Sequence, residues 1–291
     1  MIQSTPSLIS DATLCFYGAG SMAEAILRGL VEAKLTRPKN ISVMNRQNAD
    51  RLLHLEKQYG IVPVTTSALK DEALSAADVI VLGMKPKDAS EAIRTLRPLL
   101  RPEQLVISVI AGLSISTIRH LIGREQQPVV RAMPNTSSTI RLGATGISFS
   151  DSVTPGQREL AHAIFDAIGI STVVDEPLIE AVTGVSGSGP AYVYYLMEAM
   201  IDAGIKLGLS PEAAKRLTVQ TVRGAAEMVN STGEDPGELR RKVTSPNGST
   251  QAAIEKLDQF SFQEGVNEAI ARCAERAREM GEAIRKEAGL D

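Results

Sequence analysis

Short apolar runs alternate between residues 11 and 174 with longer stretches in which apolar residues recur every three or four positions. Apolar runs of four to seven residues are typical of strands buried in a parallel sheet, and the longer period is typical of amphipathic helices. This alternation predicts an α/β fold built on a doubly wound parallel sheet. The expected strands are 11–17, 41–44, 61–64, 78–82, 105–110, 128–131, 146–149 and 170–174. The expected helices are 21–34, 48–60, one that closes at 73–77, 87–100, 114–121 and 155–168.

Strand signals stop after residue 174, and the remaining chain has a helical period. The helix expected at 191–207 is apolar on more than one side, which is typical of a helix buried in a subunit interface. Further helices are expected at 177–183, from 211, from 236, at 251–257 and at 262–286. The 291 residues therefore divide into an α/β Rossmann-type domain at 1–174 and an all-α domain at 175–291.

The first expected strand runs directly into the glycine turn Gly18-Ala-Gly20-Ser-Met-Ala23. Between a strand and a helix, this spacing is the dinucleotide fingerprint: Gly18 permits the tight turn, Gly20 lets a pyrophosphate approach the backbone, and Ala23 lets the helix pack closely. The N–H groups of the first helical turn would face the phosphates. The pattern alone is a weak signal, and the strand–helix context turns it into a predicted nucleotide site.

The residues after the second expected strand favour NADP over NAD. An NAD site usually places a carboxylate there to bind the ribose 2′-hydroxyl, and that carboxylate would repel a 2′-phosphate. Here the strand is followed by Asn45 and Arg46, with no acid. A guanidinium can donate two parallel hydrogen bonds to a phosphate. Arg46 as a merely solvated charge is the competing interpretation.

Composition narrows the class of protein only a little. The formal net charge of -3 gives no reason to expect nucleic acid or an anionic membrane as partner. The two cysteines, Cys15 and Cys273, form no disulfide framework, and no metal site is expected. The first ten residues lack a leader pattern, and no apolar run approaches the ~20 residues of a membrane span. A cytoplasmic location is therefore expected.

The polar segment 244–250, Thr-Ser-Pro-Asn-Gly-Ser-Thr, ends at the start of an expected helix. The N–H groups of Gly248–Thr250 could hold a carboxylate, and the hydroxyls of Ser245 and Thr250 could orient it or reach a substrate nitrogen. An elaborate helix cap would have the same composition. From these residues alone, both interpretations stay open.

Two long C-terminal segments resemble signatures of the pyrroline-5-carboxylate reductases: 182–192, VTGVSGSGPAY, and 239–250, LRRKVTSPNGST. The glycine turn, Met84-Lys85-Pro86, Ala111-Gly112 and 133–136 (MPNT) resemble the same family in order and spacing. The similarity extends from about residue 13 to the end of the chain. It implies hydride transfer from NAD(P)H to C5 of 1-pyrroline-5-carboxylate, giving L-proline. It also implies a homodimer with interlocked C-terminal helices, or a pentamer of dimers.

The resemblance assigns site residues by position. The substrate carboxylate and ring nitrogen would lie at Ser245, Gly248, Ser249 and Thr250, with Thr250 hydrogen bonding to the nitrogen as the catalytic candidate. Glu176 matches an acidic position that the family links to the proline site. The cofactor would contact Tyr17, Gly18, Ala19, Gly20, Ser21, Met22, Asn45, Arg46, Met84, Lys85, Pro86, Ala111, Asn135 and Lys242.

Three positions depart from some relatives. Lys242 stands where those relatives have Asn, which makes its contact with the cofactor an open question. Asn247 replaces Gly, and Ser249 replaces Ala or Thr. Two rival functions remain open. One is a Rossmann/helical reductase of the 3-hydroxyacid dehydrogenase type, for which Lys206 or Lys215 would have to act; the other is a non-catalytic NADP-binding module.

Overall fold

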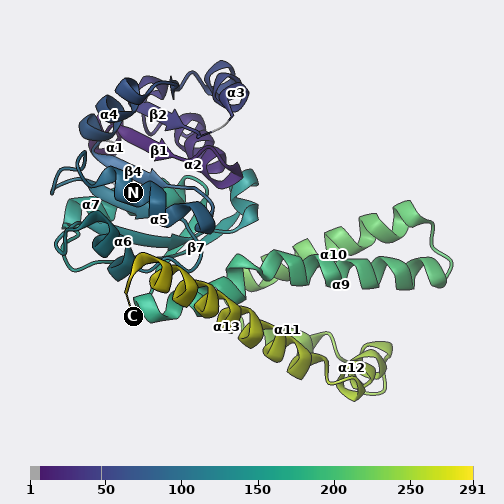
Figure 1. Cartoon of the computed structure of the whole chain (residues 1–291). Helices are drawn as coiled ribbons and strands as arrows, with labels where there is room; N and C mark the ends of the chain where they lie inside the picture. The colour runs from purple at the N-terminus through teal and green to yellow at the C-terminus, as the bar shows by residue number, and fades with distance from the viewer. Residues whose placement is uncertain (1–6, 47, 291) are drawn as a thin grey trace. The chain divides into compact units, whose positions relative to one another are not determined.

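The computed structural model describes residues 7–46 and 48–290 (Figure 1). The first ten residues were expected to contain no leader sequence. Of these, residues 1–6 lie outside the described residues. The chain forms two compact units. The first unit runs to Ser188 and includes the residues from Arg272 onward, and the second is Gly189–Ala271.

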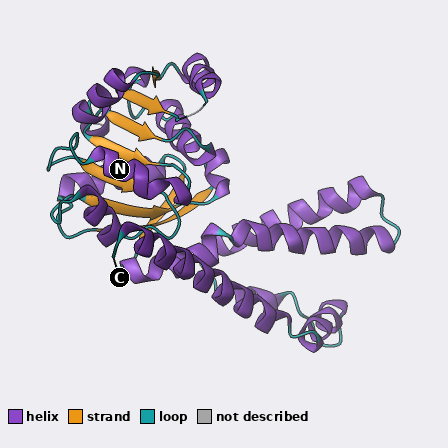
Figure 2. Ribbon diagram, in the orientation of Figure 1, coloured by secondary structure: helices purple, strands orange, loops and turns teal. Residues whose placement is uncertain are grey.

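One eight-stranded sheet forms the centre of the first unit, within the residues that the structure describes (Figure 2). Its strand order is β3-β2-β1-β4-β5-β6-β7-β8, which places the strand before the glycine turn between β2 and β4. β1 to β6 are parallel, so their carboxyl ends meet at one edge. The strands are β1 (Leu14–Tyr17), β2 (Ile41–Met44), β3 (Val62–Val64), β4 (Val79–Leu82), β5 (Leu105–Ser108), β6 (Val129–Met133), β7 (Gly143–Phe149) and β8 (Gly169–Val173).

The predicted sheet is parallel throughout, but β7 runs antiparallel to β6, and β8 follows the direction of β7. A parallel crossover needs a dozen or more residues. Only nine residues, 134–142, join β6 to β7, and five of them form the short helix η2 (Thr136–Ile140). The connection can therefore only turn the chain back. The α/β Rossmann-type fold is confirmed, with this reversed edge.

Side chains alternate along the strands between two apolar cores, one on each face of the sheet. On β1, Leu14 and Phe16 enter the first core, and Cys15 enters the second. Burial raises the pKa of the Cys15 thiol to about 11, as expected for a packed, neutral residue. The first core is covered by α2 (Ser21–Glu32), α3 (Ala49–Tyr59) and α7 (Pro155–Asp166), and the second by α4 (Ser67–Ala76), α5 (Pro86–Leu96) and α6 (Ile115–Ile122).

Helix α4 begins at Ser67, whereas only its end, at 73–77, was predicted from the sequence. The Thr66 hydroxyl caps it by accepting a hydrogen bond from the N–H of Leu69 at 3.3 Å. A threonine in this position satisfies an N–H that the first helical turn leaves without a partner. A helix that begins at Ser67 has Lys70 in its first turn.

Residues beyond the predicted boundary at 174/175 also pack on the sheet of the first unit. α8 (Ile179–Val182) contacts β6 and β7, and the π-helical turn η4 (Thr183–Gly187) follows it. Arg131 on β6, with 5% of its side chain exposed, pairs with Glu176 at 3.4 Å and Glu180 at 2.7 Å. These contacts explain why the first compact unit extends to Ser188.

The second unit is helical, as expected. Helices α9 (Gly189–Lys206) and α10 (Pro211–Thr232) pack against each other, followed by α11 (Pro236–Lys242) and α12 (Ser249–Gln259) (Figure 1). No residue of α9 is buried within the chain, and Tyr194, Tyr195 and Leu196 are exposed. None of the helices in the described part has the length and apolar character to cross a membrane.

The last helix, α13 (Phe262–Ala288), completes the first unit with its C-terminal turns. Ile284 and Ala288 are buried in the second core, and the Arg94 guanidinium donates to the carbonyls of Glu287 and Ala288. Close to them, Gly112 (φ +77) lies against the backbone of Gly281, where a Cβ on Gly112 would be 2.9 Å from the Gly281 nitrogen. The end of the chain is thus fixed to the loop after β5.

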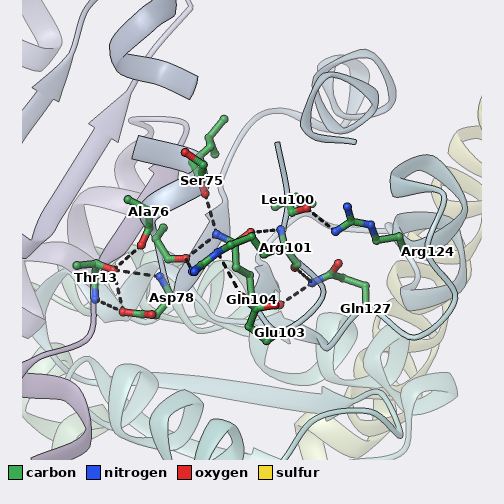
Figure 3. A network of polar contacts seen from close by, with 12 residues as sticks. Thr13, Ser75, Ala76, Asp78, Leu100, Arg101, Glu103, Gln104, Arg124 and Gln127 are labelled. Carbon is green, nitrogen blue, oxygen red and sulfur yellow. Dashed lines mark hydrogen bonds and ion pairs between the residues drawn. The ribbon is translucent and has the colours of Figure 1, made fainter. Parts of the chain in front are cut away.

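Buried glutamine side chains hold the opposite, amino edge of the sheet together (Figure 3). Gln104, 1% exposed, donates to the carbonyls of Leu74 and Ala77 at 2.8 and 2.6 Å and accepts from the N–H of Arg101. Gln127 donates in turn to the carbonyl of Gln104 at 2.6 Å. This network satisfies loop backbone groups that would otherwise be buried without partners.

We predict that Gln104→Ala lowers the free energy of unfolding by about 3 kcal/mol, because two carbonyls and one N–H lose a partner in a buried place. Urea denaturation followed by circular dichroism measures the change. The matched control is Gln58→Ala, an exposed glutamine on α3 whose removal should change the free energy by less than about 0.5 kcal/mol. Equal effects of the two substitutions would contradict the role given to the network.

Candidate functional site

A cavity of about 840 Å³ opens at the carboxyl ends of β1, β2, β3 and β4. It brings together eight of the residues that the sequence assigned to a cofactor: Tyr17, Gly18, Ala19, Gly20, Asn45, Arg46, Met84 and Lys85. They come from the loops after three neighbouring strands, where open α/β sheets bind their ligands. The geometry of this cavity is therefore consistent with a dinucleotide site.

Gly18 is required by the fold itself. It has φ +122, and a Cβ at this residue would lie 2.6 Å from the carbonyl carbon of Gly83. Its N–H donates to the carbonyl of Met44 at 3.1 Å, and the N–H of Gly83 donates to that of Tyr17 at 3.0 Å. Only glycine fits here, because the turns after β1 and β4 touch through their backbones.

Gly20 differs, because neither conformation nor packing within the chain requires a glycine. Its φ of -73° and ψ of 175° are open to any residue, and a Cβ would meet only the carbonyl oxygen of Gly83, at 3.7 Å. The space over Gly20 belongs to the cavity. Gly20 is also the N-cap of α2 and provides no side-chain cap for the first turn, at Ser21 and Met22. This combination fits a phosphate group held against the backbone.

An arginine that the sequence analysis missed braces the glycine turn. Nε of Arg51 on α3 donates to the carbonyl of Ala19 at 3.1 Å, and its guanidinium pairs with Glu24 of α2. The Tyr59 hydroxyl also donates to Glu24, at 3.0 Å. Burial acts to raise the pKa of Glu24, but the hydrogen bonds from Arg51 and Tyr59 outweigh it and lower that pKa. The carboxylate therefore stays ionised and keeps Arg51 in place.

The cavity wall carries four cations and two carboxylates. Arg46, with 66% of its side chain exposed, lies 3.5 Å from Glu91 and 3.9 Å from Asp88. Lys70 donates from Nζ to the hydroxyls of Tyr17 and Thr95, at 3.1 and 3.3 Å. Among the described residues no carboxylate pairs with Lys70, nor with the other two lysines of the wall, Lys85 and Lys87. The cavity thus has an excess of positive charge.

Other expected cofactor residues are not among those that line the cavity. Pro86 is the first residue of α5, directly after Lys85. Ala111 precedes Gly112 in the loop after β5. Asn135 uses its amide inside the protein: Nδ2 donates to the carbonyl of Ser186 at 3.0 Å, and Oδ1 accepts from the N–H of Ala144. Its observed role is to join the end of β6 to the π-helical turn.

The segment 244–250 forms an exposed to half-buried turn that leads into α12. Asn247 has φ +61, and its N–H donates to the side chain of Gln251. The N–H of Gly248 donates to the carbonyl of Ser245 at 3.0 Å, so it is used within the turn. No side chain in the described residues caps α12, which leaves the first-turn N–H groups at Ser249 and Thr250 for an anion.

Two expected site residues have partners within the chain. Glu176 accepts from the N–H of Ile115 at 2.7 Å, at the start of α6, and from Arg131. Lys242 pairs with Glu234 in the second unit. The observed contacts of Glu176 are those of a helix cap and an ion pair.

A second cavity of about 1030 Å³ lies away from the glycine turn. Arg119, Arg158 and Glu176 are among its lining residues, and Glu176 is the single member of the predicted site in its wall. Several residues of the first cavity were not predicted from the sequence: Thr65, Thr66, Ser67, Lys70, Lys87 and Thr95. The rule that ligands bind after parallel strands would have found Thr65 and Thr66, which follow β3.

Comparisons with known proteins agree with this geometry. The family model for pyrroline-5-carboxylate reductase dimerisation matches residues 176–280, and that for NADP oxidoreductase, coenzyme F420-dependent, matches residues 13–112. Pyrroline-5-carboxylate reductase 2 of Bacillus subtilis is 43% identical over 267 residues, 92% of this chain and 94% of its own length.

Two solved structures share the fold over nearly their whole length. The pyrroline-5-carboxylate reductase of Coxiella burnetii has a TM-score of 0.86 and 36% identity, covering 92% of this chain and 98% of its own. The pyrroline carboxylate reductase of Plasmodium falciparum, solved with NADP bound, has a TM-score of 0.82 and 28% identity, covering 94% and 99%. With a dinucleotide-type cavity and this extent of identity, the chain belongs to the pyrroline-5-carboxylate reductase family.

Proposed function

We propose that this chain is an NADPH-preferring reductase that converts 1-pyrroline-5-carboxylate to L-proline in the cytoplasm. Membership of the reductase family supports the reaction. The observation that carries the cofactor assignment is the open space over Gly20, where the chain itself gives no reason for a glycine. The preference for NADPH is supported by the cations of the cavity wall and by the absence of an acid after β2.

The proposed cofactor site is the first cavity and its margins. The pyrophosphate lies over residues Tyr17 to Met22, and the adenosine ribose lies at Asn45 and Arg46. When bound, the reduced nicotinamide supplies the hydride that adds to the C5 carbon of the imine. The nicotinamide side of the site is lined by Met84 to Pro86 and by Ala111. Asn135 contributes to this side by holding the loop after β6.

The proposed substrate site is the start of α12. The N–H groups of Ser249 and Thr250 bind the substrate carboxylate, since the N–H of Gly248 is engaged in the turn. Ser245 orients the carboxylate, and the Thr250 hydroxyl hydrogen bonds to the ring nitrogen. A protonated cyclic imine is already a strong electrophile, so the protein has mainly to align two rings and exclude water. Glu176 supports the site through its ion pair with Arg131. Lys242 supports it through its ion pair with Glu234.

The same proposal assigns a function to each of the two domains. Residues 1–174 bind the nucleotide, and residues 175–291 bind substrate and form a homodimer, or a pentamer of such dimers. The exposed aromatic and aliphatic side chains of α9 support an interface at this helix. The rival 3-hydroxyacid dehydrogenase is less well supported, since Lys206 is exposed and pairs with Asp202 at 2.5 Å.

One assay tests the function. Oxidation of NADPH and of NADH is followed at 340 nm with 1-pyrroline-5-carboxylate, and in reverse with a panel of 3-hydroxyacids. Turnover of the imine, faster with NADPH, is the expected result. Oxidation of a 3-hydroxyacid without imine reduction would overturn the proposal, and cofactor binding without any turnover would favour a non-catalytic module.

We predict that Arg51→Gln raises the KM for NADPH and for NADH together, by about tenfold, with little change in kcat. The substitution removes the brace on the carbonyl of Ala19 and so loosens the turn that both cofactors share. Initial-rate kinetics with each cofactor measure it. Arg37→Gln is the control, because Arg37 is exposed and its side chain has no partner in the described residues. A loss confined to NADPH would show that Arg51 acts on the 2′-phosphate instead.

We predict that Thr250→Ala lowers kcat/KM for the imine by about 10–100-fold, the cost of one hydrogen bond to a charged group, and leaves NADPH affinity nearly intact. Steady-state kinetics and fluorescence titration of NADPH separate the two quantities. Thr250→Ser keeps the hydroxyl and should retain most of the activity. If the alanine variant lost NADPH binding, Thr250 would belong to the cofactor site.

A further inference from the structure

The cavity contains a cation that is held in place by hydroxyl groups. Lys70 Nζ donates to the Tyr17 hydroxyl at 3.1 Å and to the Thr95 hydroxyl at 3.3 Å, and lies 5.0 Å from the centre of the Tyr17 ring. These contacts come from three elements: α4, the end of β1 and α5. They fix the ammonium group without neutralising it.

Arg46, the residue that the sequence pattern favoured for a 2′-phosphate, is in a different electrostatic state. Its guanidinium lies near both carboxylates of the cavity wall, Asp88 and Glu91. A phosphate would have to compete with them for Arg46. No such competition exists at Lys70, which has no carboxylate partner in the described part of the chain.

The sheet places Lys70 on the ribose side of the cavity. In folds of this class the ribose hydroxyls bind at the end of β2. Tyr17 is the register partner of Met44, the last residue of β2, and Met44 is the partner of Val64, the last residue of β3. Lys70 follows β3 by six residues and contacts Tyr17. Its ammonium therefore lies beside the strand end where an adenosine ribose is bound.

The helix dipole acts in the same direction. Lys70 is in the first turn of α4, and that turn, residues 67–70, contains no acidic residue. A cation near a helix N-terminus is electrostatically unfavourable, and an anion bound there offsets this cost. Lys85 and Lys87 also line the cavity, but they belong to α5, the helix after β4. Lys85 is the N-cap of α5, and Lys87 is within it.

From these contacts we infer that Lys70 is the residue of this chain that selects NADPH over NADH, by binding the adenosine 2′-phosphate. The inference rests on the proposed function, because it identifies how the nucleotide cavity discriminates between cofactors. Tyr17 and Thr95 position the ammonium group. Arg46 makes a smaller contribution, since its carboxylate partners remain.

The test uses the adenosine half of the cofactor alone, so that it does not depend on turnover. Isothermal titration calorimetry of the full-length protein compares adenosine 2′,5′-bisphosphate with 5′-AMP. Wild type should bind the bisphosphate more tightly. Lys70→Gln should weaken bisphosphate binding by at least about tenfold, the cost of a charge-assisted hydrogen bond, and change 5′-AMP binding by less than about threefold.

Four further variants sharpen the result. Lys70→Arg keeps the charge and should keep the preference. Tyr17→Phe, which removes one anchoring hydroxyl, should lose part of it, and Arg46→Gln should lose less than Lys70→Gln. Lys57→Gln, an exposed lysine on α3 outside the cavity, is the control and should match wild type.

Two outcomes would overturn the inference. If Lys70→Gln weakens the bisphosphate and 5′-AMP equally, Lys70 binds the 5′-phosphate that both cofactors share. If Lys70→Gln binds adenosine 2′,5′-bisphosphate as tightly as wild type does, the 2′-phosphate binds elsewhere. The proposed function fails separately: a chain that prefers the bisphosphate through Lys70 but does not reduce the imine would retain this inference and lose the reaction.

Discussion

The contact between the backbones of Gly18 and Gly83 is the constraint on which the nucleotide site depends. It brings the turn after β1 against the turn after β4, so closely that a Cβ on Gly18 would be 2.6 Å from a carbonyl carbon. The next turn of chain is then directed into α2, and Gly20 faces the cavity. Arg51 stabilises this arrangement by donating to the carbonyl of Ala19, and Glu24 holds Arg51 in place through an ion pair.

A second constraint explains why the first unit extends beyond the predicted boundary at residue 174. The short connection after β6 reverses β7, and the reversed edge needs cover from the residues that follow. Gly146 on β7 makes room for Val182, whose Cγ1 would be 2.6 Å from a Cβ at that glycine. Arg131 adds a buried ion pair with Glu180. Since a buried charge is tolerated only when paired, this contact holds 176–187 on the first unit.

The sequence pattern predicted the strands and helices that a repeating apolar period defines. It missed features of the fold that depend on single contacts. Strand β2 occupies the predicted residues 41–44, because its apolar run has turn residues on both sides. The reversal of β7 was not visible, since strand direction leaves no mark on an apolar run. The start of helix α4 was not predicted because its threonine cap was not considered, and Lys70 was missed with it.

The same distinction applies to the candidate site. Spacing was enough to identify the glycine turn, because the turn lies between a predicted strand and a predicted helix. It could not show that the N–H of Gly248 is used within its own turn, or that Arg46 is paired with Glu91. Such pairings depend on groups that the fold brings together from different elements. The chemistry of a predicted site residue is therefore decided by its neighbours in space.

The central claim is that Gly20 is a glycine for the sake of a bound nucleotide. Gly20→Ala tests it directly, with thermal unfolding and NADPH titration measured on the same preparation. We expect a Tm within about 2 °C of wild type, since the added methyl group meets only an oxygen at 3.7 Å, together with a Kd for NADPH raised at least about tenfold. An unchanged Kd, or a fall in both stability and affinity, would contradict it.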